Sequence, residues 1–443
     1  MVIVGGGVLA LFRPGVAIGV LLCTYGLEQA LQAHSAWFGV HQTAVNYATA
    51  LLVLFTAAAL FVRGRLRAVR YPPVGWLVLG LLAWAAASTL WSVDRTETIA
   101  QIVRFAPYLG AFCVLMPLCM VNMRDVRDAF WTVLLLGAAL LALMSRAEWQ
   151  GRSVILELGP GGEGGNPLAI ASLAGQVAII VVLMNYAGVA RVWQVMRWFL
   201  LALALYIGVR SGSRGQVLAM IVCIAVFLPF SRRLKRLSGW FGAMTAMAVF
   251  GTVAYWIMTQ FATDGRWDIA SMQEAYAGGR MDMVGQVLAA WANAGPARWV
   301  MGLGSSASFK LVGYYPHFVP GEILAELGLV GFTLYLAILV LTARALWQLY
   351  QRCRDFNEAR GLVVTLAGLV IFELILTCKQ GSMLGSPVFF GLLILVSRID
   401  RQVVGQAVSP VRSASSIERV PAGFASPNSL YAGNAGPFEE RAP

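Results

Sequence analysis

Apolar runs recur from one end of this chain to the other, and each has about the 20 residues that a helix needs to cross a bilayer. The composition agrees, because 59% of the 443 residues are hydrophobic and only 12% are charged. A water-soluble domain cannot cover so much apolar surface, whereas a bundle of lipid-facing helices can. The runs also lack the alternation of an outer-membrane β-barrel. The sequence therefore predicts an all-α, polytopic membrane helix bundle.

Twelve transmembrane helices are expected, which places both termini on the same side of the membrane. The predicted ranges are 14–36, 42–62, 73–92, 99–121, 128–148, 166–187, 192–209, 215–230, 238–262, 319–345, 361–379 and 385–400. The first helix is expected to act as the insertion signal, since the start of the chain has no basic residues and no cleavage site. This gives helices with short loops over 1–262, one large loop over 263–320, further helices over 321–402 and a disordered tail over 403–443.

Most of the 33 Lys and Arg residues fall in the tail and in the loops on the tail's side. The basic side of a bacterial inner-membrane protein is normally cytoplasmic. The 263–320 loop is then periplasmic, and both termini are cytoplasmic. Topology and anionic lipid headgroups account for the net charge of +12, so no nucleic-acid partner is needed. The six cysteines lack metal-ligand spacing and are interpreted as small core residues, with no metal site and no cofactor.

The 263–320 loop is the longest polar interval, so chemistry on a water-soluble group is expected there. It ends in Tyr315-Pro316-His317. A histidine has an unperturbed pKa near neutrality, so His317 is a candidate general base toward a sugar hydroxyl. The alternative is an interfacial side chain that makes one hydrogen bond. Glu322 and Glu326 follow on one face of the next helix, where they either favour the helix dipole or support the histidine.

Four arginines are candidates for binding an anion or adding positive charge. Arg210 and Arg214 flank a tight turn, Arg210-Ser-Gly-Ser-Arg214-Gly, between two short apolar runs, which indicates a turn recessed below the outer surface. A guanidinium fork matches phosphate oxygens, although snorkelling to lipid headgroups is an equal alternative. Arg280 precedes an amphipathic stretch and points either into the same cavity or toward Asp282 or Glu274. Arg104 lies inside an apolar run and must face the bundle or water, where it adds positive charge or pairs with a carboxylate such as Glu373.

Several of these segments together resemble the O-antigen ligase and O-antigen polymerase superfamily. Ser211-Gly-Ser-Arg214-Gly is similar to its Ser-x-Ser-Arg signature, and Trp91-Ser92 with Asp94 resembles a feature of its amino-terminal half. The similar segments of the large loop and the helix after it are Gly279-Arg280, Gly302-Leu-Gly304, Tyr315-Pro-His317 and Glu322-Ile-Leu-Ala-Glu326-Leu-Gly328. Phe318 stands where the family commonly has a polar residue.

This resemblance implies a metal-independent membrane glycosyltransferase that uses a glycan on undecaprenyl diphosphate. The acceptor is a sugar hydroxyl at the periplasmic face, either on the lipid A core or on a growing lipid-linked chain. Arg214 and Arg280, with Arg210, would hold the donor diphosphate, and His317 would activate or position the acceptor. Glu322, Glu326 and Arg104 would support the site. Such an enzyme acts in lipopolysaccharide or other surface polysaccharide biosynthesis.

Two other classes of protein fit a basic multi-pass bundle. A flippase of lipid-linked oligosaccharides would place its charged residues near the midplane and often shows repeated halves. A scaffold subunit would have no use for recessed arginines. The candidate residues here gather instead toward one face and one loop, which favours the enzyme.

Overall fold

The computed structural model describes residues 12–66, 71–120, 122–151, 153–156, 165–186, 189–231 and 280–408, together with residues 245, 248, 251 and 252. The predicted helix at 238–262 and the first part of the predicted 263–320 loop lie almost wholly outside the described residues. Met1–Gln402 forms one compact unit, and Val403–Pro443 forms a second.

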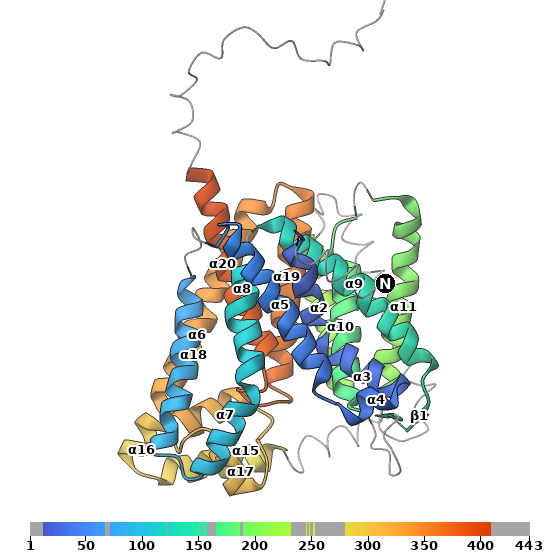
Figure 1. Ribbon diagram of the computed structural model, residues 1–443. Helices are drawn as coiled ribbons and strands as arrows, with labels where there is room; N and C mark the ends of the chain where they lie inside the picture. The colour runs from blue at the N-terminus through green and yellow to red at the C-terminus, as the bar shows by residue number, and fades with distance from the viewer. Residues whose placement is uncertain are drawn as a thin grey trace, which may run out of the picture. The chain divides into compact units, whose positions relative to one another are not determined.

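The described elements are helices apart from one short hairpin (Figure 1). The amino-terminal half contains α2 (Pro14–Leu22), α3 (Thr24–His34), α4 (Ala36–Val40), α5 (Ala44–Val62), α6 (Pro73–Ala87), η1 (Ser88–Leu90), α7 (Arg95–Leu109), η2 (Gly110–Leu115), α8 (Met116–Cys119), α9 (Met123–Arg146), β1 (Trp149–Gln150), β2 (Ser153–Val154), α10 (Pro167–Leu183) and α11 (Arg191–Arg210). The remainder contains α12 (Arg214–Ser231), α15 (Arg280–Asn293), α16 (Pro296–Met301), α17 (Ala307–Val312), α18 (Val319–Cys353), α19 (Asn357–Thr377) and α20 (Pro387–Val408).

Within the described residues, eight helices are long and apolar enough to cross a membrane, or nine if the bent pair α2–α3 is one span. The chain is thus a polytopic helical membrane protein. The twelve predicted crossings exceed this number, partly because one of them lies outside the described residues and α10 has only 17 residues. All six cysteines are free thiols, and five of them are buried, as expected for core residues.

The predicted single helix at 14–36 is wrong, because the chain bends by 63° between α2 and α3. Thr24 lies at the bend, and its hydroxyl donates to the carbonyl of Leu21 at 2.7 Å. A threonine that bonds back to the preceding turn weakens the regular helix and favours bending. Periodicity alone did not reveal this break, because both halves are apolar.

Helix α10 lies at the centre of the bundle and packs against α9, α11, α12 and α19. Small residues allow these close approaches. A Cβ at Gly175 of α10 would overlap the ring of Phe372 in α19, and one at Gly137 of α9 would overlap Val177 of α10. Helices in membranes associate mainly through such close packing, since lipid tails are as apolar as the side chains. The glycines therefore set the spacing around α10.

Helix α7 loses its regular hydrogen bonding where it passes into η2, a π-helical turn. Pro117 has no amide hydrogen, so the carbonyl of Cys113, four residues earlier, cannot receive its usual helical bond. The Tyr71 hydroxyl donates to that carbonyl instead. Burial raises the pKa of Tyr71, which keeps the phenol in its donating form.

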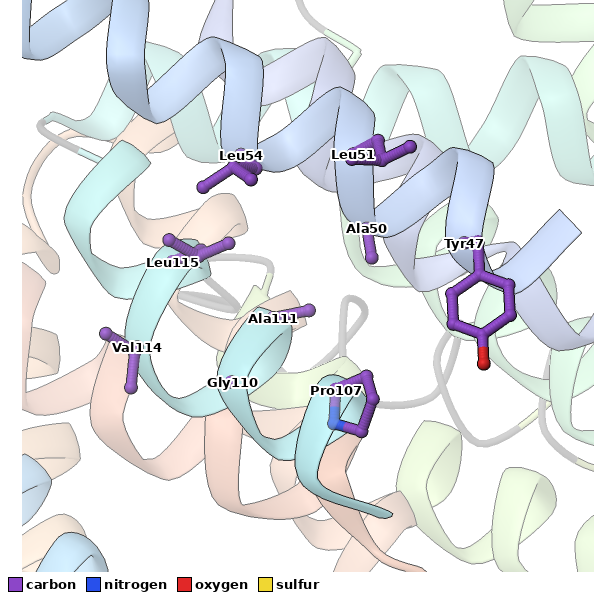
Figure 2. Close-up of a pocket in the computed structure, with 9 residues that line it drawn as sticks. All are labelled: Tyr47, Ala50, Leu51, Leu54, Pro107, Gly110, Ala111, Val114 and Leu115. Atoms are coloured by element: carbon purple, nitrogen blue, oxygen red, sulfur yellow. The ribbon is translucent and has the colours of Figure 1, made fainter. Parts of the chain in front are cut away.

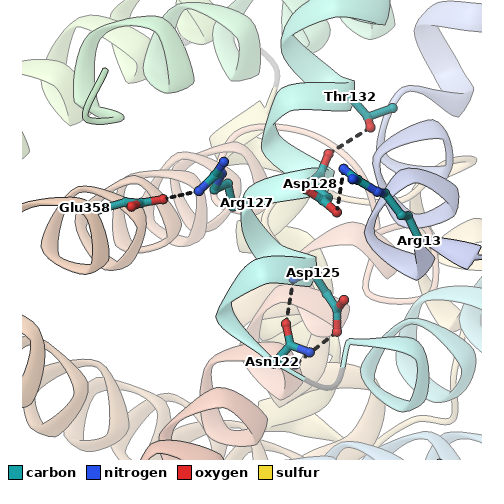
Figure 3. A network of polar contacts seen from close by, with 7 residues as sticks. All are labelled: Arg13, Asn122, Asp125, Arg127, Asp128, Thr132 and Glu358. Carbon is teal, nitrogen blue, oxygen red and sulfur yellow. Dashed lines mark hydrogen bonds and ion pairs between the residues drawn. The ribbon is translucent and has the colours of Figure 1, made fainter. Parts of the chain in front are cut away.

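Polar side chains gather at the first turn of α9, at the end of this helix that is remote from the β1–β2 hairpin (Figure 3). Asn122 and Asp125 form a capping box, in which each side chain accepts from the other residue's backbone N–H at 3.0 Å. Arg127 pairs with Glu358 of α19 at 2.6 Å. The pair is solvent-exposed, so it contributes at most about 1 kcal/mol. It links α9 to α19 at their exposed ends.

The two helices around the Arg210–Arg214 turn are longer than the apolar pattern predicted. Helix α11 has 20 residues and α12 has 18, so both are long enough to cross a membrane. The length argument for a recessed turn is therefore wrong. Counting apolar residues from Trp198 started the run too late, because Arg197 lies inside α11. Its guanidinium rests over the rings of Trp198 and Tyr186 at 4.8 and 5.6 Å.

Candidate functional site

Helix α18 is broken at Gly328, which has φ 67° and ψ −166°. The break leaves carbonyls of the preceding turn without helical partners, and a distant segment satisfies them. Leu303 and Gly304 donate backbone N–H bonds to the carbonyls of Ala325 and Glu326 at 2.9 and 2.8 Å. Trp84 Nε1 of α6 donates to the Leu327 carbonyl at 3.0 Å. The Gly302–Gly304 motif therefore binds the Glu326–Gly328 motif through the backbone.

The side chain of Glu326 strengthens the same arrangement. It is 2% exposed, and it accepts from the backbone N–H of Ser306 at 2.6 Å, from that of Ser308 at 3.0 Å and from the Ser308 hydroxyl at 2.7 Å. Three donors on one carboxylate make a strong anchor, because hydrogen bonds to a charged group are stronger than neutral ones. The structure thus gives Glu326 a role in holding the loop.

The Trp91–Asp94 segment also forms hydrogen bonds with the segment from 298 to 308. Arg298 donates to the Trp91 carbonyl at 2.6 Å, and Val93 N–H donates to the Leu303 carbonyl at 3.2 Å. Asp94 caps α7 by accepting from the Glu97 N–H at 3.0 Å. The Trp91-Ser92 and Asp94 motif of the sequence therefore binds and positions the segment from 298 to 308.

His317 lies just before α18, in a left-handed backbone conformation with φ 59°. Its ring packs against those of Tyr315 and Tyr314, with centroids 4.6 and 5.3 Å away. It borders a cavity of about 300 Å³, which we call the His317 cavity. The lining residues are Met281, Val284, Pro316, His317, Phe318, Cys378 and Lys379. Among these seven residues Lys379 carries a positive charge and none is a carboxylate, so the charge at the described lining favours an anion over a cation.

Lys379 connects the His317 cavity to the start of α12. Its side chain lies directly over Gly215, where an added Cβ would overlap it, and its Nζ donates to Gln216 Oε1 at 2.7 Å. Gly215 and Gln216 directly follow Arg214, the first residue of α12. On the opposite wall, Met281 and Val284 belong to the first turns of α15, which begins at Arg280. The helix that begins at Arg214 therefore contacts Lys379, and the helix that begins at Arg280 lines the same cavity as Lys379.

The side chain of Arg280 lies outside the described residues, so only the start of its helix can be placed. Arg210, at the end of α11, donates to the Tyr206 hydroxyl and lies over the Trp149 ring at 5.1 Å. The contact with Trp149 links Arg210 to strand β1. Its role at a donor diphosphate stays a prediction.

A second, more polar cavity lies behind the first and has a volume of about 370 Å³. We call it the Arg104 cavity. Tyr315 and Gln380 line the Arg104 cavity, whereas their neighbours His317 and Lys379 line the His317 cavity. The segments 315–317 and 378–381 therefore form a common wall between the two spaces.

The Arg104 cavity contains several groups that suit polar ligands. Arg104 lines it from α7, and Glu373 lines it from α19, where the carboxylate accepts from Gln176 Nε2 at 3.0 Å. Burial is the main factor that raises the pKa of Tyr315, so this residue stays a neutral phenol at physiological pH. A phenol, an amide and a guanidinium bind hydroxyl or anionic oxygens.

Glu322 lies one turn into α18 and is 5% exposed. It accepts from the backbone N–H of Met383 at 3.0 Å. This bond joins the start of α18 to the loop between α19 and α20, which carries Lys379 and Gln380. Glu322 therefore helps to hold the common wall in place.

A third cavity differs from the first two because its lining is almost entirely apolar (Figure 2). It lies between α5 and the Pro107–Leu115 stretch, with Leu51 and Leu54 on one side and Val114 and Leu115 on the other. Tyr47 supplies a hydroxyl, but no charged side chain lines this cavity, so we exclude it from the site.

Sequence reasoning missed Lys379, Gln216 and Gln380. Lys379 is one of only three lysines, with Lys235 and Lys310, and it stands between two apolar runs. A lone lysine between two apolar runs could have been singled out from the sequence as a candidate functional residue. The link to α12 was not predictable, because it depends on a glycine that leaves room for a side chain from a distant loop.

No family model matches this chain, and no curated protein matches it. Six solved chains match by structure. One of them belongs to a structure described as "Structural coordination of polymerization and crosslinking by a peptidoglycan synthase complex". It is 16% identical, with a TM-score of 0.40, and the alignment covers 75% of this chain and 98% of that chain. A likeness of this size carries no inference about a shared activity.

Proposed function

We propose that this protein transfers a glycan from an undecaprenyl-diphosphate-linked donor to a sugar hydroxyl at the periplasmic face of the inner membrane. The observation that carries the proposal is the convergence on the His317 cavity. The helix that begins at Arg214, the helix that begins at Arg280 and His317 itself all border this space or its Lys379 wall. The resemblance to the O-antigen ligase and polymerase superfamily selects the same three residues.

The proposed reaction needs positive charge at one atom and a proton acceptor at another. The bond from the anomeric carbon to the diphosphate oxygen breaks, and its electron pair stays on the diphosphate. The acceptor hydroxyl oxygen bonds to that carbon, and its proton passes to His317. Because negative charge grows on the leaving diphosphate, fixed cations stabilise the transition state more than the ground state.

The acceptor is a sugar of the lipid A core or of a growing lipid-linked chain. In the proposed arrangement the donor diphosphate occupies the His317 cavity, and the acceptor approaches His317. Periplasmic orientation of this face follows the basic-residue rule. A reporter fused after Arg419 that is active only when exported would contradict this orientation.

The test is transfer by purified protein in detergent micelles with a lipid-linked glycan as donor. Arg214→Ala and Arg280→Ala should each abolish transfer while the protein stays folded. Lysine should restore little, since an ammonium lacks the planar fork of a guanidinium. Arg354→Ala is the matched control, because Arg354 is exposed and pairs with Asp355. Supplying lipid A core or a second lipid-linked glycan as acceptor distinguishes ligation from polymerisation.

The same assay separates the enzyme from a flippase. Micelles have no two faces, so a flippase gives no product there, whereas a transferase forms a new glycosidic bond. Full activity of both arginine variants would contradict the proposal. Absence of any product from the wild type with either acceptor would favour the flippase.

A further inference from the structure

We infer that Lys379 binds the donor diphosphate directly, as a third cation beside Arg214 and Arg280, and that Gly215 and Gln216 exist to position it. The inference rests on the proposed function and deepens it. Neither the sequence motifs nor the family resemblance pointed to this lysine.

The first argument is the space that Gly215 provides. A Cβ at this position would overlap Cδ and Cε of Lys379 and would lie 2.5 Å from Nζ. Helix interiors favour alanine over glycine by about 1 kcal/mol, and Gly215 lies in the first turn of α12. The glycine therefore gives up helix propensity so that the lysine can lie against the helix start.

The second argument is the orientation of Gln216, which is 1% exposed. Its side-chain oxygen accepts from Lys379 Nζ at 2.7 Å, and its amide nitrogen donates to the side-chain oxygen of Gln380. The two bonds fix which way the amide points. An amide oxygen carries no net charge, so this bond holds the ammonium in place and leaves it protonated.

The third argument is electrostatic. The Lys379 side chain lies at the first turn of α12, where the helix dipole is positive, and Arg214 begins that helix. Positive groups at a helix start favour an anion there. Lys379 also lines the His317 cavity, whose described lining has no carboxylate. A diphosphate has the charge and the size for this position.

Lys379 would act on the leaving group. The electron pair released from the anomeric carbon stays on the diphosphate oxygen, and the ammonium stabilises that charge without giving up its proton. A lysine serves here as a compact point charge, in contrast to the fork of an arginine. The same contact should hold undecaprenyl diphosphate after transfer.

Binding of undecaprenyl diphosphate to protein in nanodiscs tests the inference without knowledge of the sugars. The wild type should bind it more tightly than undecaprenol. Lys379→Met should weaken binding by about tenfold to a hundredfold, the usual loss for one charged hydrogen bond. Lys379→Arg should retain part of the affinity. Lys310→Met is the matched control, because Lys310 is exposed and donates to the Val93 carbonyl.

Gly215→Ala provides a second variant that keeps every charge. The flexible lysine can move aside, so the protein should fold, but the ammonium leaves its position and binding should weaken. Gly208→Ala is its control, because a Cβ there would meet Val217 at an ordinary 3.6 Å. If Lys379→Met and Gly215→Ala both bind undecaprenyl diphosphate like the wild type, the inference is wrong and the proposed function stands. If the wild type does not distinguish the diphosphate from undecaprenol, both are wrong.

Discussion

Gly302 and Gly328 lie backbone against backbone. A Cβ added at either glycine would lie 2.5 Å from the amide nitrogen of the other. Both have positive φ, 80° and 67°, which residues with a side chain rarely adopt. This contact joins the segment from Pro296 to Val312 to the break in α18, and it determines the first prediction.

Gly328→Ala and Gly302→Ala should each destabilise the protein by about 1–3 kcal/mol, because a strained φ adds to a steric overlap. Thermal unfolding in detergent measures the loss. Limited trypsin digestion should also cut faster at Arg298 and Lys310. Gly285→Ala is the control, since a Cβ there meets nothing within 4 Å. Unchanged melting and digestion in both variants would show that the contact is not needed.

Glu326→Ala should cost about 2–3 kcal/mol, because it removes the acceptor from three buried donors. Ser308→Ala removes only the hydroxyl bond and should cost about 1 kcal/mol. Thermal unfolding ranks the two variants. Ser145→Ala controls for loss of a hydroxyl at an exposed site. Equal losses from the Glu326 and Ser308 variants would contradict the anchoring role.

His317→Asn should abolish glycan transfer with little change in stability. Asparagine adopts positive φ more readily than most residues, so it preserves the backbone at this position. His317→Ala should lose the same activity. Its free energy of unfolding should also fall by about 1 kcal/mol, because alanine is strained at positive φ. Transfer rate and melting temperature are both measured. Near-normal transfer by His317→Asn would leave His317 with a packing role only.

Tyr71→Phe should change how stability depends on pH. Burial raises the folded-state pKa of Tyr71, so the folded form holds the phenolic proton more tightly than the unfolded form. Its contribution is complete below the unfolded value of about 10 and is lost as pH rises above it. The wild type should therefore lose stability at alkaline pH more steeply than Tyr71→Phe. Parallel pH profiles in thermal unfolding would argue against a buried, donating phenol.

The sequence predicted the membrane class and most helix positions, because apolar runs report directly on lipid exposure. It failed at the Thr24 bend and in the length of the apolar run assigned to α11. In the first case a side-chain hydroxyl bends a continuous apolar run, and in the second Arg197 covers aromatic rings at the helix end. Neither effect changes hydropathy in a way that a sequence window can detect.

The sequence named the residues proposed for the site, but it did not predict their arrangement. The motifs around Trp91, Gly302 and Glu326 were found separately, whereas the bonds that join them run between backbone atoms of distant segments. Glu326 illustrates the difference. Its spacing from Glu322 indicated one shared face, yet it binds the loop from Ser306 to Ser308 and Glu322 binds Met383.

The break at Gly328 has a consequence for how a substrate enters. The segment from Pro296 to Val312 is fastened to α18 by backbone bonds and by Glu326, and to the start of α7 through Trp91 and Val93. Opening it would rupture all of these bonds together, so this segment is a fixed rim and not a lid. Under the proposed function, a lipid-linked donor would therefore enter the His317 cavity from the bilayer side while this rim stays still.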